Sequence, residues 1–443
     1  MSTIDGVGRR EFLKGIAAMA ATAHLGAGMV RAQDEAPPFR FGLIGCGGQG
    51  RVALMGNAKR IPGAQIVACC DIRPANLQQA LEQAGEGAKG FEDYHEMLGS
   101  VEMDGVIVAT PLTTHKDIVV AAFEAGFPVF CEKCMAYSVE DCKEMLRAQM
   151  KAGEILQIGH HLRYHPLYHH AKAAFVDKGV LGDIMAVYAQ WDRNGPWRRQ
   201  VPDAEAAMDF TKWGFASAEE LVNWRLYKHL SGGLMTELGS HQIDVAMWML
   251  GQEPNAVTAV GGIDFYKDGR TVPDNVRVIY EFPSGTKFYY QSLTTNAFGM
   301  FGNECHEMFC GTKGTLVLSH LAPDPASSKG WFFLEPGVQT ELWMDAAHKE
   351  TVGPKDAIIL DVTVTEGTPI AGQPYGTLMD QSGKLKKYTY QLELEEFITS
   401  VRESKVPSCD GRIGMRSAAH AMMANQAIEQ QARIPFDEAM FQL

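Results

Sequence analysis

The sequence has 443 residues, of which 46% are apolar and 21% are charged. A chain of this length and composition can form two domains with sizeable cores. Its formal net charge of −13 argues against nucleic acid or an anionic membrane as a partner, because either would need a basic surface, and favours a small or neutral substrate. The nine cysteines have no regular spacing, so we expect buried apolar residues rather than a disulfide scaffold.

Residues 1–32 resemble a twin-arginine export signal. The pair Arg9-Arg10 precedes an apolar run over Ile16–Val30, and small residues stand just before Gln33, where we expect the mature chain to begin. The run is shorter than the roughly 20 residues that a membrane span requires, so no stable span is expected. The signal predicts an exported, periplasmic protein, and a retained N-terminus that anchors the chain to a membrane is the alternative.

A dinucleotide-binding pattern follows the signal. A short apolar strand, Phe41–Ile44, leads into G-x-G-x-x-G, and a helix-forming stretch covers Arg51–Arg60 before a second apolar strand, Ala64–Cys70. The loop after the first strand consists of Gly45, Cys46, Gly47, Gly48, Gln49 and Gly50. Glycines here permit a tight turn, a close approach of the backbone to a pyrophosphate and close packing of helix on strand, with the phosphates at the helix N-terminus.

The acid that ends the second strand bears on the choice of cofactor. Asp71 lies 21 residues after Gly50, where a carboxylate can accept both ribose hydroxyls and repel a 2′-phosphate. NAD is therefore the predicted cofactor. Arg73 stands two residues further on and could hold a 2′-phosphate, so NADP stays open as the alternative.

Strands and helices alternate as far as residue 158. The expected helices are Pro74–Ala84, His115–Ala125 and Val139–Ala152, and the expected strands are Val106–Ala109, Pro128–Cys131 and Ile155–Ile158. This alternation predicts a Rossmann-type parallel sheet that binds its ligand at the carboxyl ends of the strands. Further cofactor-binding candidates fall at those ends: Thr110, Pro111, His115, Glu132 and Lys133. We assign residues 33–158 to this NAD-binding domain.

The pattern changes after Gly159. A helix is expected over Pro166–Lys178. Runs rich in β-branched and aromatic residues follow at Ile184–Gln190, Ala256–Phe265, Val276–Phe282, Lys287–Leu293, Glu307–Cys310 and Thr315–Ser319. They predict a second α/β domain, residues 159–385, with a large, mostly antiparallel open sheet and with loops and edge strands over residues 324–383. In residues 386–443, the helices Tyr390–Glu403 and Arg416–Ala432 are expected to pack back on the core.

Two stretches carry candidate catalytic residues. Lys133 follows a strand beside the predicted cofactor, where a lysine can exchange a proton with a substrate hydroxyl; a lysine in a surface loop is the alternative. Glu237, His241 and Asp244 are spaced to share one face of a helix that runs to Leu250. Acids beside an imidazole suit a general base, whereas the same spacing can also hold a metal or form an ordinary polar face.

Polar residues gather again after the first domain. Within eleven residues stand five histidines, His160, His161, His165, His169 and His170. We favour the polar lining of a cleft over a metal site, because the helix that begins near Pro166 does not align them. Arg163, beside Tyr164, can anchor a substrate oxygen. The pair Cys131-x-x-Cys134 lacks the helix-start setting of a redox dithiol.

Aromatic residues are concentrated in one stretch. Within 34 residues lie Trp191, Trp197, Trp213 and Trp224, interspersed with Asp192, Arg193, Asn194, Arg198 and Arg225. Flat rings beside polar side chains suit a sugar, whose C–H face packs on rings and whose hydroxyls need fixed partners. A lid or a core cluster explains the same aromatics equally well.

These motifs together resemble those of the Gfo/Idh/MocA oxidoreductases, the glucose-fructose oxidoreductase and inositol dehydrogenase family. The similarity covers most of the mature chain and rests on GLIGCGGQGR, VACCD, VIVATPLTTH, the EK of CEKCM, GHHLRYHP and GGLMTELGSHQID. By position, Lys133 matches the lysine of the family's Glu-Lys-Pro motif, His241 the catalytic histidine and Glu237 the acid four residues before it. Cys134 replaces the proline of the motif, and Glu237 replaces a commoner aspartate.

The resemblance implies a Rossmann domain, a C-terminal α/β domain whose open sheet often mediates dimers or tetramers, and hydride transfer between nicotinamide and a sugar or polyol carbon. It implies that His241 deprotonates the reacting hydroxyl, that Lys133 shares the proton relay and that Glu237 orients them. The expected substrate-binding residues are Arg163, Tyr164, His165, Trp191, Trp224 and Asp244. No bound metal ion is expected. The chain is expected to form a homo-oligomer.

The export signal adds an expectation and an alternative. A protein that collects its dinucleotide in the cytosol and travels folded would hold NAD tightly and regenerate it on the enzyme. The predicted function is an NAD-dependent oxidoreductase that acts on a sugar, polyol or glycoside hydroxyl. An NAD-dependent glycoside hydrolase or lyase, which oxidises the ring transiently and eliminates a substituent, is the first alternative because it consumes no cofactor. A non-catalytic sugar-binding protein is the second.

Overall fold

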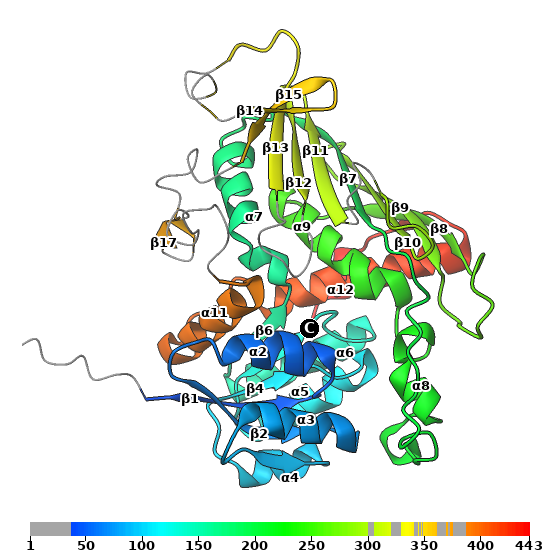
Figure 1. Cartoon of the computed structure of the whole chain (residues 1–443). Coiled ribbons are helices and arrows are strands. Elements are labelled where there is room, and N and C mark those ends of the chain that lie inside the picture. The colour runs from blue at the N-terminus through cyan, green and yellow to red at the C-terminus, as the bar shows by residue number, and fades with distance from the viewer. Residues whose placement is uncertain are drawn as a thin grey trace, which may run out of the picture. The chain divides into compact units, whose positions relative to one another are not determined.

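The computed structural model describes residues 37–299, 305–319, 329–340, 344, 347, 349–360, 369–370, 373–374 and 387–443. Phe39–Leu443 forms one unit (Figure 1). The predicted export signal, with Arg9 and Arg10, lies outside the described residues, as does much of the predicted loop region 324–383. Within the described ranges, no helix combines the length and apolar character needed to cross a membrane.

The first sheet confirms the predicted Rossmann fold. Its strands are β1 (Phe39–Ile44), β2 (Ala64–Cys70), β3 (Lys89–Phe91), β4 (Gly105–Val108), β5 (Val129–Glu132) and β6 (Leu156–Gly159). All neighbours pair in parallel, in the order β3-β2-β1-β4-β5-β6. The strand order reverses between β1 and β4, and the carboxyl ends of these two strands therefore flank the crevice in which such sheets bind ligands.

The helices α3 (Pro74–Ala84), α5 (His115–Glu124) and α6 (Val139–Ala152) lie close to their predicted positions. α4 (Tyr94–Ser100) also belongs to this part. The bounds of α6 are those predicted, because Ser138 caps its first turn and Gly153 ends it in the left-handed conformation. The helix after β1 begins earlier than predicted, since Gly48–Met55 is already helical and continues into α2 (Gly56–Ala58).

The second sheet confirms the predicted, mostly antiparallel α/β domain. It contains β7 (Ile184–Trp191), β8 (Ala256–Gly262), β9 (Asn275–Glu281), β10 (Lys287–Leu293), β11 (Cys305–Gly311), β12 (Gly314–Ser319), β13 (Lys329–Leu334), β14 (Lys349–Val352), β15 (Lys355–Ile359) and β18 (Ile434–Pro435). Their order is β14-β15-β13-β12-β11-β7-β10-β9-β8-β18. Only β7 and β10 pair in parallel among these described strands. A separate pair is formed by β16 (Pro369–Ile370) and β17 (Gln373–Pro374).

One face of the second sheet packs against helices. Alternate residues of β10 are buried, and Phe288 and Tyr290 join side chains of α9 (Ser240–Leu250) and α12 (Gly411–Gln430) in one core. α9 continues the helical residues Met235–Gly239. On the same side, α7 (Pro166–Ala171) continues into Lys172–Val176.

The two C-terminal helices contact both sheets. α11 (Thr389–Glu403) places Leu394, Phe397 and Ile398 in the core of the first sheet, and α12 contacts α6, α9 and β8. α12 begins before the predicted Arg416 because Asp410 caps it and Gly414 packs directly on Ile158, an approach that a side chain would block. The proposed domain limits at residues 158 and 385 stay predictions.

A long connection links β7 to the helix at Met235. We call residues 192–230 the crossing segment. It holds α8 (Ala218–Val222) and a small core of its own, in which Phe210, Phe215 and Leu221 are buried. An ion pair between Arg73 and Glu205, with 2.8 Å between Nε and Oε2, joins it to the first domain. In Figure 1 the segment runs from the second sheet to the level of the first.

Replacement of Phe397 by alanine is expected to lower the free energy of unfolding by about 3–5 kcal/mol. The ring is fully buried and packs on Phe39, Phe41 and Phe130 at centroid distances of 6.1, 6.0 and 6.1 Å, which attaches α11 to the first sheet. Denaturant titration measures the effect. In the control, Phe265→Ala, the ring is 67% exposed and the change should stay within about 0.5 kcal/mol. Equal losses for the two variants would contradict this packing.

Candidate active site

Two neighbouring cavities open at the carboxyl ends of the first sheet. The first cavity, of about 590 Å³, is lined by the glycine loop, by residues that follow β2 and β4, and by the crossing segment. The second cavity, of about 260 Å³, is lined by residues that follow β5, by the helix before α9 and by α9 itself. Both are lined by Gln49, Ala109, Thr110, Arg199, Trp224 and Arg225, so the two cavities meet at these residues.

The predicted cofactor-binding residues divide between the two cavities. The first cavity is lined by Gly45, Gly47, Gly48, Gln49, Asp71, Arg73, Thr110 and Pro111. The second is lined by His115, Glu132 and Lys133, and also by Gln49 and Thr110. Gly50 lines neither, because it is buried beneath the loop, where a Cβ atom would overlap the main-chain oxygen of Gly45.

The glycines of the loop have distinct physical roles. Gly45 has a φ of +93°, and a Cβ there would lie 2.5 Å from the main-chain oxygen of Ala109 at the end of β4. A Cβ at Gly47 or Gly48 would meet no atom within 4 Å, and both residues line the first cavity. Such a Cβ would therefore occupy space that the cavity leaves to a ligand, and the helix that begins at Gly48 directs free N–H groups toward it. The loop thus fits the pyrophosphate of a dinucleotide.

Asp71 holds the loop as well as facing the cavity. Its Oδ2 accepts a hydrogen bond from the main-chain N–H of Cys46 at 2.7 Å, and its Oδ1 accepts one from the N–H of Arg73 at 2.8 Å. Burial raises the pKa of Asp71, although these two bonds and one from Asn76 act in the opposite direction. The acid that was predicted to bind a ribose therefore also ties β2 to the glycine loop.

The side chain of Arg73 is held by the crossing segment. Its Nε donates to Oε2 of Glu205, which is only 2% exposed. The sequence left Arg73 open as a ligand for a 2′-phosphate. In the structure a buried carboxylate already occupies one edge of its guanidinium, which lowers its capacity to bind a second anion.

Lys133 and Glu237 meet in the second cavity. Lys133 Nζ donates to the main-chain oxygen of Glu237 at 2.8 Å, and the Glu237 carboxylate accepts a hydrogen bond of 2.7 Å from Nε of Arg225. Burial opposes ionisation of Glu237, but the charges of Arg225 and Lys133 outweigh it and lower the pKa of this acid. An ionised Glu237 therefore holds Arg225, while its main chain positions the ammonium group of Lys133.

His241 projects into the same cavity from α9 and is surrounded by rings. Its imidazole lies 4.8 Å from that of His161, 5.9 Å from that of His160 and 5.2 Å from the ring of Trp191, measured between centroids. Trp197 and Trp224 also line this cavity. The aromatic residues of the predicted sugar-binding stretch therefore do come together around His241, with Trp213 lining the first cavity instead.

Two buried side chains hold the loops that carry these groups. Glu132 accepts hydrogen bonds from Gln49 Nε2 at 2.7 Å and from the main-chain N–H of Lys133 at 3.1 Å, and burial raises its pKa. His115 places Nδ1 3.1 Å from the main-chain oxygen of Cys134 and Nε2 3.0 Å from that of Thr110. The loops after β1, β4 and β5 are thus connected to one another beside the cavities.

Four of the expected substrate-binding residues lie outside the lining of the two cavities. Arg163, Tyr164, His165 and Asp244 line neither cavity. Arg163 Nε and Nη2 donate to the two carboxylate oxygens of Asp244 at 2.7 and 3.0 Å, and both side chains are buried. Asp244 lies on the side of α9 that meets α12, where it also accepts from Ser417, so it does not share the active face of Glu237 and His241. His165 instead accepts from the N–H of Leu167 and caps α7.

The sequence also offers cysteines and histidines as candidates for redox or metal sites. All nine cysteines are free thiols, and burial raises the pKa of Cys131 and brings that of Cys134 to about 12, so this pair is a poor source of thiolate. In the part of the chain that the structure describes, no three His, Cys, Asp or Glu side chains are placed to hold a metal ion.

Sequence reasoning missed several residues that line the cavities. Arg199 lies where the two cavities meet, and Tyr390 of α11 reaches the second cavity and packs on His161 at 4.9 Å. Glu205 reaches Arg73 from 132 positions away in the chain. Nothing local in the sequence signals these long-range contacts. Arg225 stands next to Trp224, and the aromatic stretch did point to it.

Comparisons with known proteins agree with this architecture. Residues 39–160 match the GFO_IDH_MocA model, an oxidoreductase family with an NAD-binding Rossmann fold. Residues 174–436 match the model of the C-terminal alpha/beta domain of that family. An uncharacterized oxidoreductase of Streptococcus pneumoniae is 32% identical over 50% of this chain and 53% of its own length. Inositol 2-dehydrogenase 2 of Saccharopolyspora erythraea is 29% identical over 50% of this chain and 56% of its own. These matches span about half of each relative.

Other relatives are matched over a larger share of their own length. scyllo-Inositol 2-dehydrogenase (NAD(+)) of Bacillus subtilis is 28% identical over 68% of this chain and 81% of its own. Among solved structures, levoglucosan dehydrogenase in complex with NADH and levoglucosan has a TM-score of 0.67 at 18% identity, over 90% of this chain and 99% of that one. The aldose-aldose oxidoreductase of Caulobacter crescentus has a TM-score of 0.67 at 21% identity, over 90% and 100% of the two chains. The chain therefore belongs to the GFO_IDH_MocA oxidoreductase family, with an NAD-binding Rossmann domain followed by the C-terminal α/β domain of the family.

Proposed function

We propose that this protein is an NAD-dependent oxidoreductase that removes hydride from a hydroxyl-bearing carbon of a sugar, polyol or glycoside. The observation that carries the proposal is the meeting of Lys133 and His241 in a small cavity that adjoins the cavity of the glycine loop. Bound NAD supplies the hydride acceptor. The names of the related inositol dehydrogenases and of levoglucosan dehydrogenase support a polyol or sugar as the substrate class.

In this proposal the residues of the second cavity share the proton chemistry. His241 accepts the proton of the reacting hydroxyl as general base. Lys133 Nζ, held on the main-chain oxygen of Glu237, keeps further N–H bonds to donate to the same substrate oxygen and polarises it. Glu237 acts through its position, because the carboxylate contact that the structure gives it runs to Arg225.

The aromatic walls suit the substrate class. Trp191, Trp197 and Trp224 bring flat apolar faces to a cavity of about 260 Å³, which is below the usual volume of a drug-sized pocket. A single sugar or cyclitol ring is the size of ligand that this space favours, with the C–H face of the ring on a tryptophan. Trp191 and Trp224 are the proposed contacts.

We also propose that NAD is held tightly and that the protein is exported. Lys212, Trp213 and Leu221 of the crossing segment line the first cavity opposite the glycine loop, so a cofactor there would be covered by a segment anchored through Arg73 and Glu205. The twin-arginine sequence at Arg9-Arg10 supports export to the periplasm in the folded state.

A redox-neutral cleavage stays the second candidate function. Export of a protein with a tightly held cofactor favours a cycle that returns hydride to the substrate, and an NAD-dependent glycoside hydrolase or lyase would use the same His241 and Lys133.

A homo-oligomer is proposed because the second sheet exposes apolar side chains. Met185, Val260 and Ile279 are 55%, 66% and 39% exposed.

Replacement of His241 or Lys133 by alanine is expected to lower turnover by about 100- to 10,000-fold while NAD stays bound. NADH absorbance is followed with a panel of free sugars, inositols and glycosides, after any nucleotide that copurifies has been released and identified. The matched controls are His229→Ala and Lys228→Ala, which change exposed residues outside both cavities. Unchanged turnover in His241→Ala would restore the non-catalytic alternative, and sugar release without net NADH would favour the hydrolase or lyase.

Replacement of Glu205 by glutamine is expected to shift cofactor preference toward NADP by about tenfold. The change removes the carboxylate that occupies Arg73 and so leaves that guanidinium able to bind a 2′-phosphate. Dissociation constants for NAD and NADP, measured by calorimetry, give the ratio. The control is Glu219→Gln, whose carboxylate pairs with Arg198 and lines neither cavity. An unchanged ratio in Glu205→Gln would show that Arg73 does not discriminate between the cofactors.

A further inference from the structure

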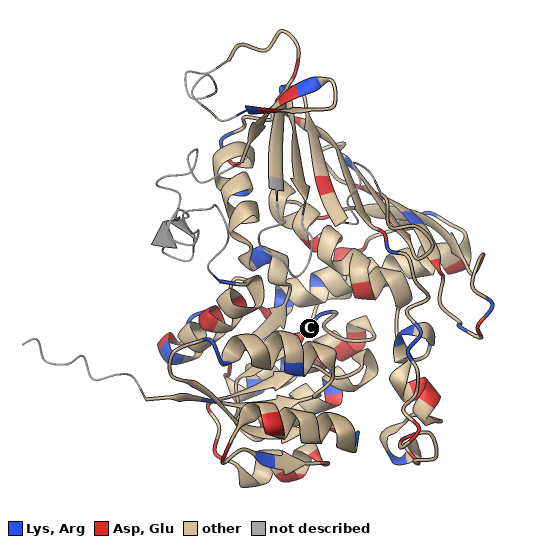
Figure 2. Ribbon diagram, viewed as in Figure 1, with Lys and Arg blue, Asp and Glu red and all other residues tan. Residues whose placement is uncertain are grey.

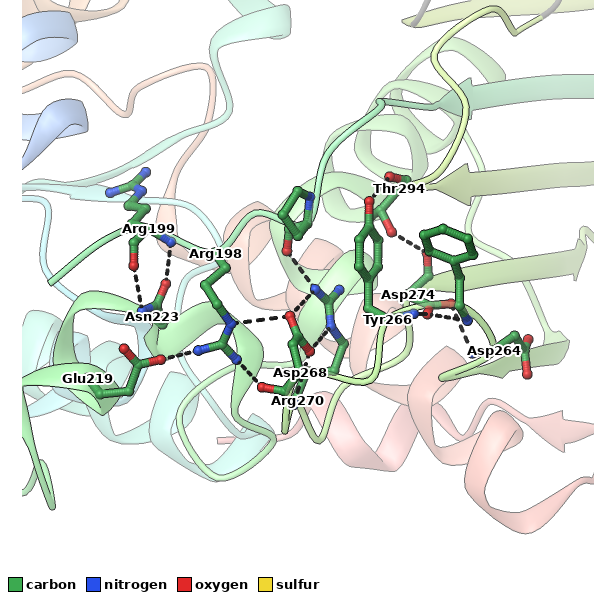
Figure 3. A network of polar contacts seen from close by, with 12 residues as sticks. Arg198, Arg199, Glu219, Asn223, Asp264, Tyr266, Asp268, Arg270, Asp274 and Thr294 are labelled. Carbon is green, nitrogen blue, oxygen red and sulfur yellow. Dashed lines mark hydrogen bonds and ion pairs between the residues drawn. The ribbon is translucent and has the colours of Figure 1, made fainter.

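Arg199 is fixed at the junction of the two cavities by its main chain. The side-chain amide of Asn223 accepts a hydrogen bond of 2.7 Å from the Arg199 N–H and donates one of 3.0 Å to the Arg199 carbonyl oxygen. Asn223 is only 2% exposed. Figure 3 shows the guanidinium pointing away from Asn223, on the side opposite to the network of Arg198, Asp268 and Arg270. The backbone is thus held while the charged end is left to the cavities.

Arg199 differs from the neighbouring arginines in its side-chain contacts. No carboxylate or other acceptor among the described residues bonds its guanidinium, whereas its neighbours Arg73 and Arg225 are paired with Glu205 and Glu237. Burial and the like charges of Arg225 and Arg73 lower the pKa of Arg199, although the charge of Glu237 acts in the opposite direction. Arg199 is exposed, so its guanidinium is accessible, and three cations beside one another repel unless an anion joins them. The arrangement therefore indicates a ligand that brings negative charge.

The balance of charge in the two cavities indicates which ligand this is. The first cavity has Arg73, Arg199, Lys212 and Arg225 against Asp71, Glu92, Asp93 and Asp117, so its basic and acidic residues are equal in number. The second has Lys133, Arg193, Arg199 and Arg225 against Glu132 and Glu237 alone, and burial raises the pKa of Glu132. Basic residues therefore exceed acidic ones only in the second cavity.

The excess of basic over acidic residues is confined to the second cavity. The chain as a whole carries a formal charge of −13, and acidic and basic residues are spread over both sheets and their helices (Figure 2). A basic cavity inside an acidic protein attracts an anion at short range while the surface repels it at long range. The expectation of a neutral substrate, which rested on net charge, overlooks this separation.

We propose that the second cavity binds a sugar that carries a carboxylate, and that Arg199 is the residue that receives this group. The proposal rests on the proposed function for the assignment of the second cavity to the substrate. A guanidinium fork binds a carboxylate with two parallel hydrogen bonds, which fixes orientation as well as charge. A carboxylate in place of a hydroxymethyl group adds little volume, whereas a phosphate ester adds much more, and the cavity holds only about 260 Å³.

Calorimetric titration of the NADH-loaded protein tests the proposal with matched pairs of probes, glucuronate with glucose and galacturonate with galactose. The acid of at least one pair should bind about tenfold more tightly than its neutral partner, the effect of one charge-assisted hydrogen-bonded contact. Arg199→Gln should remove that difference, and Arg199→Lys should keep part of it, because lysine retains the charge without the fork. The control is Lys228→Gln, which removes a charge from the crossing segment outside both cavities.

The outcomes separate this inference from the proposed function. Selective binding of a uronate that produces no NADH would support the acid site and count against a dehydrogenase. Turnover of neutral sugars with equal affinity for their uronates would support the dehydrogenase and overturn the acid site, as would an acid preference that survives Arg199→Gln. Weaker NADH binding by Arg199→Gln with no acid preference in the unaltered protein would assign Arg199 to a cofactor phosphate and also overturn the proposal. Binding of no probe at all would overturn it as well.

Discussion

The close approach of three chain segments at the glycine loop is the constraint on which the rest of the site depends. A Cβ atom at Gly50 would overlap Gly45, and a Cβ at Gly45 would press on the end of β4, so only glycine allows β1 to turn into a helix at this place. Asp71 ties the loop to β2 through the N–H of Cys46. Gln49 then reaches Glu132, and Glu132 accepts from the N–H of Lys133. One continuous set of bonds therefore places the lysine of the second cavity relative to the phosphate-binding turn.

The crossing segment completes both cavities from the other domain. It supplies Glu205 to Arg73, Trp224 and Arg225 to the shared boundary, and Lys212 to the wall of the first cavity. A segment with few helical residues can do this because it has a small apolar core of its own around Phe210 and Phe215 and a polar network at its base, where Arg198 bonds Asp268 (Figure 3). Since Arg225 also holds Glu237, the same segment helps to set the position of the proton-transfer groups.

Charged side chains near the site are of two kinds. Arg163 and Asp244 form a pair with two hydrogen bonds and no access to either cavity, and such a pair joins α9 to the residues after β6 without chemistry of its own. Arg199 is exposed at a boundary between cavities, beside two guanidinium groups, and no carboxylate of the described chain is hydrogen-bonded to it. A bonded partner therefore distinguishes the structural charge from the charge that is left to a ligand.

The sequence by itself determined the parallel sheet, the glycine loop with Asp71, the position of Lys133 after β5 and the mostly antiparallel second sheet, because strand periodicity, turn residues and strand ends are local properties. It also identified Glu237, His241 and the tryptophan stretch as candidates. It did not reveal that Arg163 and Asp244 bond each other outside the lining of both cavities, because only packing against α12 decides where that side of α9 turns. Glu205 and Tyr390 acquired their places from contacts across more than a hundred residues, and tertiary structure alone supplies such contacts.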